Sequence, residues 1–398
     1  MKIIIAGKNN IAVNIATWLL AKYEDLELYA IFNRNDIGKD QYQRSFKRYC
    51  ESNQQIKNIT LEEAYTIDDA IFLSLEFDRI INPENFAHQN LFNIHFSLLP
   101  KYKGMYTSAW PILNNEASSG VTVHIIDKGI DTGAIIAQHE FGLTSNETAR
   151  TLYEKYIKFG TELLIQKLPE MISGTIKHYD QSAHFSTYYS RNSIDYSNVK
   201  IDLNKTASEI KSQINAFTFR YYQLPRLFGF DIFGCQILQT KSHKKPGILL
   251  SESEQNIIIS TIDYDLVLFK DNLKRILELC KSGVSDDIVS LGYRPEILFE
   301  KNEHGWSPII VAAYHGNIDM IKWLIRQGCN INDNNNNGTT VAMYLKDYIA
   351  KSREFHLFNE IKALGADFSI RDYNGRDLLD YVDASGDKEL ADAIQRIM

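Results

Sequence analysis

Cysteine, proline and long apolar runs are scarce in this 398-residue chain. The four cysteines lie far apart with no Cys-x-x-Cys pair, which argues against a disulfide framework and favours buried, reduced thiols. No run approaches the roughly 18 apolar residues that a membrane span requires. The apolar start, Met1–Gly7, is too short for the core of a signal peptide. We therefore predict a cytoplasmic protein without membrane insertion.

Basic clusters are also missing. The formal net charge is −7 at pH 7, and no stretch concentrates lysine and arginine. Because nucleic-acid surfaces gather positive charge on one face, we expect no nucleic-acid partner. The length and the 44% hydrophobic content allow two or three domains, each with a core of its own.

Strand and helix signals alternate along the first third of the chain. A helical spacing of apolar residues runs from Ile11 to Tyr23, between short β-rich runs. This alternation predicts a Rossmann-like, mostly parallel sheet with helices on both faces. Ligands of such sheets gather at the carboxyl ends of the strands. The predicted strands are Ile3–Ala6, Leu28–Phe32, Ile71–Leu75, Asn93–Phe96 and Val121–Ile126.

The turn after the first predicted strand has one glycine, Gly7, where a dinucleotide-binding fingerprint needs three. Without the second glycine the backbone could not approach a pyrophosphate closely, so NAD is disfavoured. Lys8 and Asn9 follow directly. They either contact a substrate or, with Asn10, form an ordinary strand-to-helix turn.

Three polar residues stand where strands are expected to end. Asn93 and His95 share one face of a strand, about 7 Å apart along the chain, and Asp131 follows 36 residues after His95. An amide that donates to an oxyanion, an imidazole that carries protons near neutral pH and a carboxylate form a candidate acyl-transfer site. Asp131 would orient the imidazole, stabilise its cation or accept a proton itself. No histidine spacing suggests a metal, and mid-strand His124 is expected to be structural.

The motif from Asn93 to Pro100, followed by Gly104 and the segment Val123–Gly133, resembles the formyltransferase family that uses 10-formyltetrahydrofolate. That family includes methionyl-tRNA and glycinamide-ribonucleotide formyltransferases and the N-formyltransferases of nucleotide-linked amino sugars. The resemblance covers roughly residues 1–185. It implies that Asn93, His95 and Asp131 are the catalytic trio and that the formyl donor is 10-formyltetrahydrofolate.

The resemblance also implies where the folate lies. In the family the pterin follows a strand-to-loop segment through main-chain groups, which here resembles residues 73–81, with the loop from Asp127 to Asp131 on its other side. The residues expected to contact the folate are Leu75, Phe77, Asp78, Ile80 and Asp127.

The loop after Gly104 departs from the tRNA and purine enzymes, which commonly have a proline soon after this glycine. The continuation Met105-Tyr106-Thr107 is similar to the subgroup that formylates dTDP-linked amino deoxyhexoses for cell-surface polysaccharide. Met105 and Tyr106 would offer a 6-deoxy sugar an apolar surface, with Thr107 as a polar contact. Ordinary loop packing is the alternative.

Residues from about 190 to 265 are rich in tyrosine and in β-branched residues. We expect a small β-rich domain with one helix, Ala207–Ala216. Within it, Arg220, Tyr222 and Gln223 suit stacking on a base and neutralisation of a phosphate. Packing between domains explains the same residues equally well.

The last third of the chain resembles an array of ankyrin repeats. Gly305, Gly338 and Gly375 are separated by 33 and 37 residues, near the ankyrin period of about 33. Such arrays usually bind proteins; the alternative is a small ligand held near Trp306. The predicted domains are residues 1–188 (catalytic), 189–264 (β-rich) and 265–398 (all-α ankyrin repeats).

We therefore predict a homodimeric N-formyltransferase that acts on a dTDP-linked amino-dideoxyhexose for O-antigen or another surface polysaccharide. An amine at C3 of the sugar is slightly preferred to one at C4. Formyl transfer to methionyl-tRNA or a ribonucleotide is the alternative within enzymes. An ankyrin interaction protein with an inactive formyltransferase domain is the alternative of another class.

Overall fold

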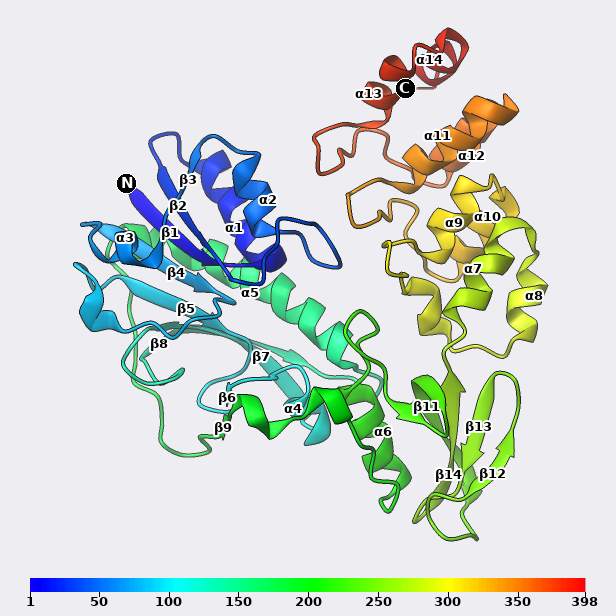
Figure 1. The fold of residues 1–398 in the computed structure, drawn as a ribbon, viewed down its shortest axis with the longest axis horizontal. Helices are drawn as coiled ribbons and strands as arrows, with labels where there is room; N and C mark the ends of the chain where they lie inside the picture. Colours follow the sequence, from blue (N-terminus) through cyan, green and yellow to red (C-terminus); the bar gives the residue numbers. More distant parts are fainter. Residues whose placement is uncertain (398) are drawn as a thin grey trace. The chain divides into compact units, whose positions relative to one another are not determined.

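The computed structural model describes residues 1–397 and falls into two compact units (Figure 1). Unit 1 contains Met1–Phe219 and Gln223–Pro225, and unit 2 contains Arg220–Tyr222 and the chain from Arg226 onward. The four cysteines are buried free thiols, as predicted. Within residues 1–397, no helix has both the length and the apolar character needed to cross a membrane.

Unit 1 is built on a seven-stranded sheet with the order β3-β2-β1-β4-β5-β7-β8. The first five strands in this order are parallel, while β7 runs antiparallel to β5 and β8 antiparallel to β7. The predicted mostly parallel sheet is thus confirmed. Its strands are β1 (Lys2–Gly7), β2 (Glu27–Phe32), β3 (Ile56–Asn58), β4 (Ala70–Leu75), β5 (Leu91–His95), β7 (Ser118–Ile125) and β8 (Ile135–Gly142).

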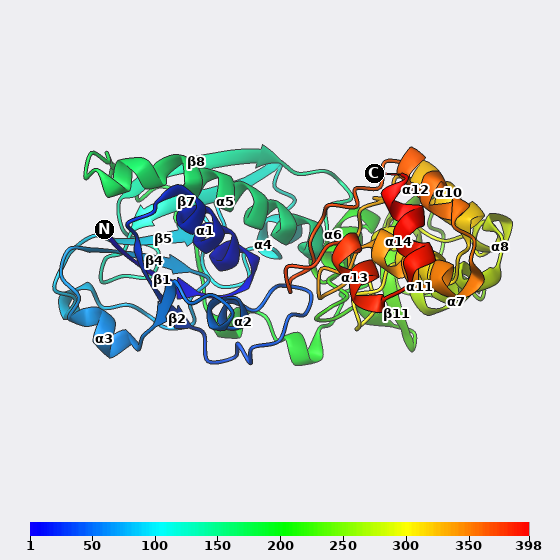
Figure 2. The ribbon, with the colours of Figure 1, turned by 90° about the horizontal axis from the view of Figure 1, so that it is seen from above.

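Helices cover both faces of this sheet. On one face α1 and α5 lie side by side (Figures 1 and 2), and Gly160 of α5 lets the side chains of Ile11 and Ile94 come close. On the other face, Ile4 and Phe72 share a core cluster with Leu61 of α3. The helices of unit 1 are α1 (Asn9–Lys22), α2 (Phe46–Glu51), α3 (Leu61–Tyr65), α4 (Trp110–Leu113), α5 (Ala149–Ile172) and α6 (Ala207–Ala216).

A second, two-stranded sheet pairs β6 (Lys103–Gly104) with β9 (Tyr188–Tyr189). Helix α6 has the predicted bounds, but it packs on α4, and residues 189–219 group with unit 1. The sequence prediction assigned residues 189–219 to the β-rich domain, because their aromatic content does not indicate which core they join.

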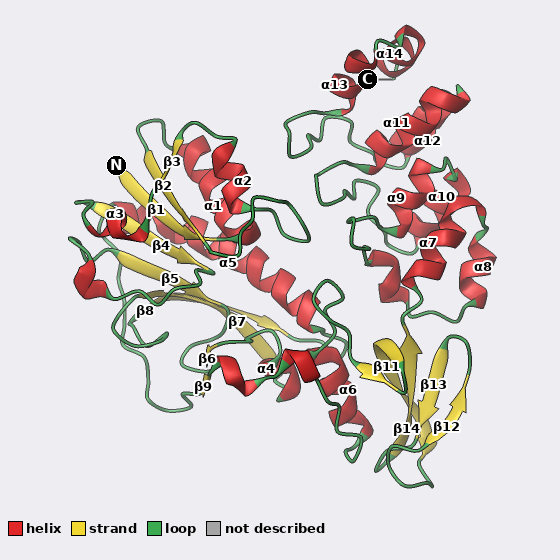
Figure 3. Ribbon diagram, in the orientation of Figure 1, coloured by secondary structure: helices red, strands yellow, loops and turns green. Residues whose placement is uncertain are grey.

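Unit 2 begins with the predicted β-rich part, an antiparallel sheet with the order β10-β11-β14-β13-β12. These strands are β10 (Arg226–Leu227), β11 (Phe230–Lys241), β12 (Leu249–Glu252), β13 (Asn256–Ile259) and β14 (Tyr264–Lys270). The remainder is helical (Figure 3). Its helices are α7 (Leu273–Ser282), α8 (Ser285–Ser290), α9 (Pro308–Tyr314), α10 (Ile318–Arg326), α11 (Val341–Ser352), α12 (His356–Ala363), α13 (Leu378–Ser385) and α14 (Lys388–Gln395).

The recurring glycines of the helical part have a common backbone role. Gly305, Gly338 and Gly375 adopt φ values of 77°, 79° and 79°. This left-handed conformation favours glycine, which explains why glycine returns at each repeat. Helix α9 packs against both α7 and α11, so successive repeats stack on one another.

Candidate active site

Asn93 and His95 lie in the second half of β5, on the face of the sheet that α3 covers further back. Leu91, two residues before Asn93, belongs to the same core cluster as Leu61 of α3. Alternation along the strand therefore turns Asn93 and His95 toward this face. Ile94 points the other way, toward α5.

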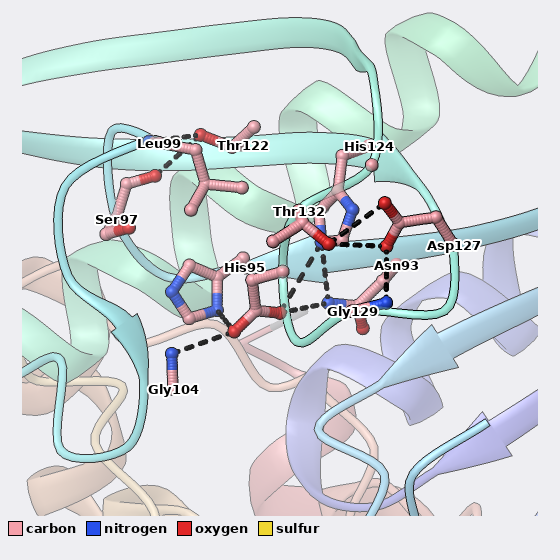
Figure 4. Close-up of polar contacts among 12 residues, drawn as sticks. Asn93, His95, Ser97, Leu99, Gly104, Thr122, His124, Asp127, Gly129 and Thr132 are labelled. Carbon is pink, nitrogen blue, oxygen red and sulfur yellow. Dashed lines mark hydrogen bonds and ion pairs between the residues drawn. The ribbon is translucent and has the colours of Figure 1, made fainter. Parts of the chain in front are cut away.

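Asp131 comes from the loop between β7 and β8 and meets both residues. Its Oδ2 lies 3.5 Å from His95 Nδ1 and accepts a hydrogen bond from the Gly104 amide at 2.8 Å. Its Oδ1 lies 3.4 Å from Asn93 Nδ2 and 3.6 Å from His124 Nε2. The structure thus brings together the three residues that the sequence singled out, and Figure 4 shows Asn93, His95, His124 and Gly104 converging.

The hydrogen bonds of His124 determine how the Asn93 amide is oriented. His124 Nδ1 lies 2.8 Å from the Ile125 carbonyl oxygen, which can only accept, so Nδ1 carries the proton. Nε2 of the neutral ring is then an acceptor, and Asn93 Nδ2 donates to it at 3.0 Å. The second Nδ2 hydrogen points at Asp131. Asn93 therefore donates both amide hydrogens within the site.

His95 is held by a main-chain oxygen. Its Nε2 lies 2.7 Å from the Tyr102 carbonyl oxygen, so Nε2 donates and carries a hydrogen. In the neutral ring the lone pair is then on Nδ1, the atom that faces Asp131. A proton taken up by His95 would arrive at Nδ1, beside a carboxylate.

Asp131 is ionised at neutral pH. Burial alone raises the pKa of this carboxyl, but the charge of a protonated His95 and the hydrogen bond from the Gly104 amide outweigh it. The pKa of Asp131 therefore lies well below its ordinary value. A carboxylate held in this state stabilises a neighbouring cation better than it accepts a proton.

The loop after Gly104 is tied to the segment around β9. Gly104 has φ 89°, and a Cβ there would lie 2.2 Å from the Tyr189 carbonyl oxygen. The Tyr106 hydroxyl donates to the Arg191 carbonyl oxygen at 3.0 Å, and its ring packs edge-on against Tyr196. Met105 remains 45% exposed, which leaves its side chain available to a ligand.

Thr107 is partly buried, and its carbonyl oxygen accepts a hydrogen bond from the Tyr156 hydroxyl at 3.1 Å. The sugar-contact loop of the sequence prediction, Met105 to Thr107, is therefore anchored at Tyr106 and Thr107 and open at Met105.

The segment proposed for the folate follows β4. Phe77 packs against the core cluster below Asn93, as Ile126 does from the loop that carries Asp131. Asp78 accepts a hydrogen bond from the Arg34 amide at 3.0 Å, and Ile80 is 77% exposed. The two segments thus border the same face.

Two further residues of the folate prediction have defined surroundings. Leu75 is buried at the end of β4. The Asp127 carboxylate accepts hydrogen bonds from the Gly129 amide and the Thr132 hydroxyl, which shapes the loop ahead of Asp131.

Lys8 and Asn9 stand at the start of α1. Lys8 precedes the helix and is half-buried, and Asn9 Nδ2 donates to Glu76 at 3.1 Å and to the Tyr153 hydroxyl at 3.0 Å. Both residues lie at the carboxyl end of β1, the edge of the sheet where His95 ends β5.

The predicted stacking segment divides between the units. In unit 2 the Arg220 guanidinium forms a bidentate pair with Asp271 and lies 3.3 Å from Glu300, over the Phe233 ring. Because two carboxylates balance its charge, we propose a structural role for Arg220 in place of the phosphate contact.

The neighbours of Arg220 differ in exposure. Tyr222, also in unit 2, is 57% exposed with its ring edge-on to Tyr221. Gln223 belongs to unit 1, where its backbone pairs with that of Phe219.

In the repeat array, the Trp306 ring lies 5.8 Å from that of Tyr314 and 5.7 Å from that of Tyr344. Asn335 donates to the Tyr344 hydroxyl at 2.7 Å. Among residues 1–397, no three His, Cys, Asp or Glu side chains are grouped so that they could hold a metal ion.

Comparison with known proteins agrees with both parts of the chain. A family model described as formyl transferase matches residues 32–168, and a model of ankyrin repeats in three copies matches residues 276–351. A crystal structure of WlaRD, a sugar 3N-formyl transferase, superposes with a TM-score of 0.64 at 44% identity, over 68% of this chain and 98% of WlaRD. The chain belongs to the formyltransferase family.

Other relatives of this formyltransferase span different shares of it. An N-formyltransferase from Helicobacter canadensis, solved with folinic acid and dTDP-3-aminofucose, is 43% identical, with a TM-score of 0.63 over 68% of this chain and all of that one. Methionyl-tRNA formyltransferase of Clostridium tetani is 32% identical over 183 residues, which are 45% of this chain and 57% of that protein. The chain thus matches little more than half the length of that curated relative.

Sequence reasoning missed several residues of the formyltransferase site. His124 was expected to be structural, yet it contacts Asn93 and Asp131. The contact arises because β5 and β7 pair antiparallel with His124 opposite Asn93, a pairing that the predicted, mostly parallel sheet did not include. Glu76 and Tyr153, which bind Asn9, gave no local signal either, since they lie 67 and 144 residues from it.

Proposed function

We propose that the protein transfers the formyl group of 10-formyltetrahydrofolate to the amine of a dTDP-linked amino-dideoxyhexose. The observation that carries this proposal is the convergence of Asn93, His95 and Asp131, with His124 behind them. The two sugar N-formyltransferases at 43–44% identity support it: one was solved with dTDP and 5-N-formyl-tetrahydrofolate and the other with folinic acid and dTDP-3-aminofucose.

His95 is proposed to carry the proton. The sugar amine forms a bond to the formyl carbon and loses a proton, and the folate nitrogen leaves with a proton as its bond to that carbon breaks. His95 Nδ1 accepts the first proton and supplies the second. Asp131, 3.5 Å away, stabilises the imidazolium between these steps.

Asn93 is proposed to stabilise the oxyanion of the tetrahedral intermediate. One of its amide hydrogens is held firmly by His124 at 3.0 Å, while the contact with Asp131 is longer, at 3.4 Å. The second hydrogen is the one that an oxyanion draws away. His124 keeps the amide nitrogen turned toward the reacting carbon, which makes the donor preorganised.

The acceptor is proposed to be a 3-amino-3,6-dideoxyhexose. Met105 offers an exposed apolar surface that suits a 6-deoxy carbon. The preference for C3 over C4 follows from the relatives, one a sugar 3N-formyl transferase and the other solved with a 3-aminofucose nucleotide. We further propose Leu75, Phe77, Asp78, Ile80 and Asp127 as folate contacts, and Lys8, Asn9, Tyr106, Thr107 and Gln223 as substrate contacts.

The test is a competition among amines. Purified full-length protein is given 10-formyltetrahydrofolate with dTDP-3-amino sugars, dTDP-4-amino sugars, glycinamide ribonucleotide or methionyl-tRNA, and formyl amides are identified by mass spectrometry. The proposal expects the 3-amino nucleotide sugars to have the highest kcat/KM. Formylated methionyl-tRNA as the sole product would establish the alternative enzyme. No turnover of any amine would support the inactive, interaction-only reading.

The cellular setting is also a proposal. We propose a cytoplasmic homodimer whose product enters O-antigen or another surface polysaccharide, to be checked by light scattering and by analysis of polysaccharide from a deletion strain. For the ankyrin array we propose protein binding as the main role. The alternative is that the aromatic cluster around Trp306 binds a small ligand. Comparing the equilibrium binding of a dTDP-amino sugar by the wild type and by a Trp306→Ala variant distinguishes protein binding from ligand binding.

A further inference from the structure

A partly buried polar cluster at the ends of β1 and β4 has no part in the proton transfer described above. The Tyr153 hydroxyl donates to the Glu76 carboxylate, and its oxygen lies 2.8 Å from Oε2 and 3.0 Å from Oε1. Asn9 Nδ2 donates to Glu76 Oε2 at 3.1 Å and to the Tyr153 hydroxyl oxygen at 3.0 Å. All three side chains come from unit 1: Asn9 begins α1, Glu76 follows β4, and Tyr153 lies on α5.

This cluster determines which way the Asn9 amide points. Glu76 can only accept when ionised, and Tyr153 spends its single hydrogen on Glu76, so both present acceptors to Asn9. The amide nitrogen of Asn9 must therefore face them and use both hydrogens. Among the described residues, none donates a hydrogen bond to Asn9 Oδ1, which is left as an acceptor for something else.

Maintaining the cluster is costly. Asn9 and Glu76 both have left-handed backbones, with φ values of 64° and 58°, a conformation that is uncommon outside glycine. Burial raises the pKa of Glu76 even though Lys8, Tyr153 and Asn9 favour its charged form. An apolar side chain at this position would avoid the desolvation of a carboxylate, so the cost points to a role beyond packing.

The cluster adjoins the candidate active site. In the sheet order β4 lies between β1 and β5. Leu75 at the end of β4 pairs with Ile94 of β5, so the next residues along the chain, Glu76 and His95, lie side by side in the register. Strands β2 and β4 flank β1, which places Asn9 at a switch point of the topology, where ligands of such sheets bind.

We infer that Glu76 and Tyr153 are positioning residues for the acceptor: they hold Asn9 so that its Oδ1 accepts a hydrogen bond from a hydroxyl or amine hydrogen of the amino sugar. This inference rests on the proposed function, because it assumes a hexose with such donors. Asn9 thus recognises a hydrogen-bond donor of the sugar, and Glu76 orients the Asn9 side-chain amide.

The test measures the KM for the acceptor, the KM for the donor and kcat separately in variants of the cluster. Asn9→Leu and Glu76→Leu are expected to raise KM for a dTDP-3-amino sugar about three- to tenfold, the worth of one hydrogen bond, with donor KM and kcat little changed. Glu76→Gln keeps an acceptor for Asn9 and should restore much of the loss. Tyr49→Phe, which removes the α2 tyrosine hydroxyl that accepts a hydrogen bond from Thr17, is the matched control for Tyr153→Phe.

The outcomes are distinguishable. If Glu76→Leu does not fold, Tyr153→Phe decides: a raised acceptor KM supports the inference and an unchanged one overturns it. Equal increases in donor and acceptor KM would show a merely structural cluster and also overturn it. A wild-type protein that formylates no amino sugar would instead refute the proposed function.

Discussion

Replacing Asp131 by asparagine tests the assignment of proton carrier and charge stabiliser. The exchange keeps the size of the side chain, and the amide oxygen can still accept from the Gly104 amide. It removes one negative charge 3.5 Å from His95 Nδ1. At an effective dielectric constant of about 20, that pair is worth up to about 5 kcal/mol, an upper bound of roughly three orders of magnitude in rate.

We therefore expect Asp131→Asn to lower kcat by about 10²- to 10³-fold with little change in either KM. The assay is steady-state formyl transfer to a dTDP-3-amino sugar, with the exposed Asp202→Asn as a matched control that retains wild-type rates. A kcat within about threefold of wild type would refute the role given to Asp131.

The same variant has a predicted signature in stability. Because the folded-state pKa of Asp131 is depressed, its ionised form contributes stability above the ordinary carboxyl value of 3.8 and loses it as the pH falls through the folded-state pKa. Urea denaturation should find the wild type more stable than the variant near neutral pH, with the gap shrinking below about pH 4.

Three further perturbations test the surrounding structure. Both ring nitrogens of His88 are buried without hydrogen bonds, and burial lowers the pKa of this side chain. Near pH 6.5 the unfolded chain therefore binds a proton that the folded chain does not, so the free energy of unfolding falls as the pH drops below that value. His88→Phe should flatten this pH dependence, measured by denaturation at several pH values. Arg220→Met removes the bidentate partner of Asp271 and should cost about 3–5 kcal/mol of unfolding free energy, with Arg220→Lys costing less; a loss under about 1 kcal/mol would contradict the buried pair. Gly104→Ala forces a Cβ against the Tyr189 carbonyl and should lower both the melting temperature and the activity, whereas a stable, active variant would show that the loop adapts.

Local patterns in the sequence predicted much of the fold. The run Ile3–Ala6 became β1 with one more residue at each end, and Ala207–Ala216 became α6 without change. These elements follow from periodicity and capping, which act over a few residues. The unit to which α6 belongs could not be predicted, since that depends on its packing against α4, nearly a hundred residues earlier.

The site divides in the same way. Asn93, His95 and Asp131 were found because they stand in motifs that resemble a known family. The main-chain groups that hold them, the Tyr102 carbonyl and the Gly104 amide, leave no trace in side-chain identity. Arg220 shows a different limit: its residue type suits either a phosphate or a carboxylate, and only the structure shows Asp271 beside it.

Backbone strain explains why the centre of the site is hard to read from sequence. Ten non-glycine residues within the described chain have positive φ, and half of them lie at strand ends and loops around the site: Asn9, Glu76, Tyr102, Tyr106 and Asp131. Each costs of order 1 kcal/mol, so local preference opposes these conformations, and only the assembled sheet enforces them. At Glu76 the left-handed turn diverts a carboxylate from the face of His95 toward Asn9 and Tyr153. Glycine would relieve this strain at each position but would remove the side chain or aromatic contact that the site uses, so the strained residues are those that function would retain.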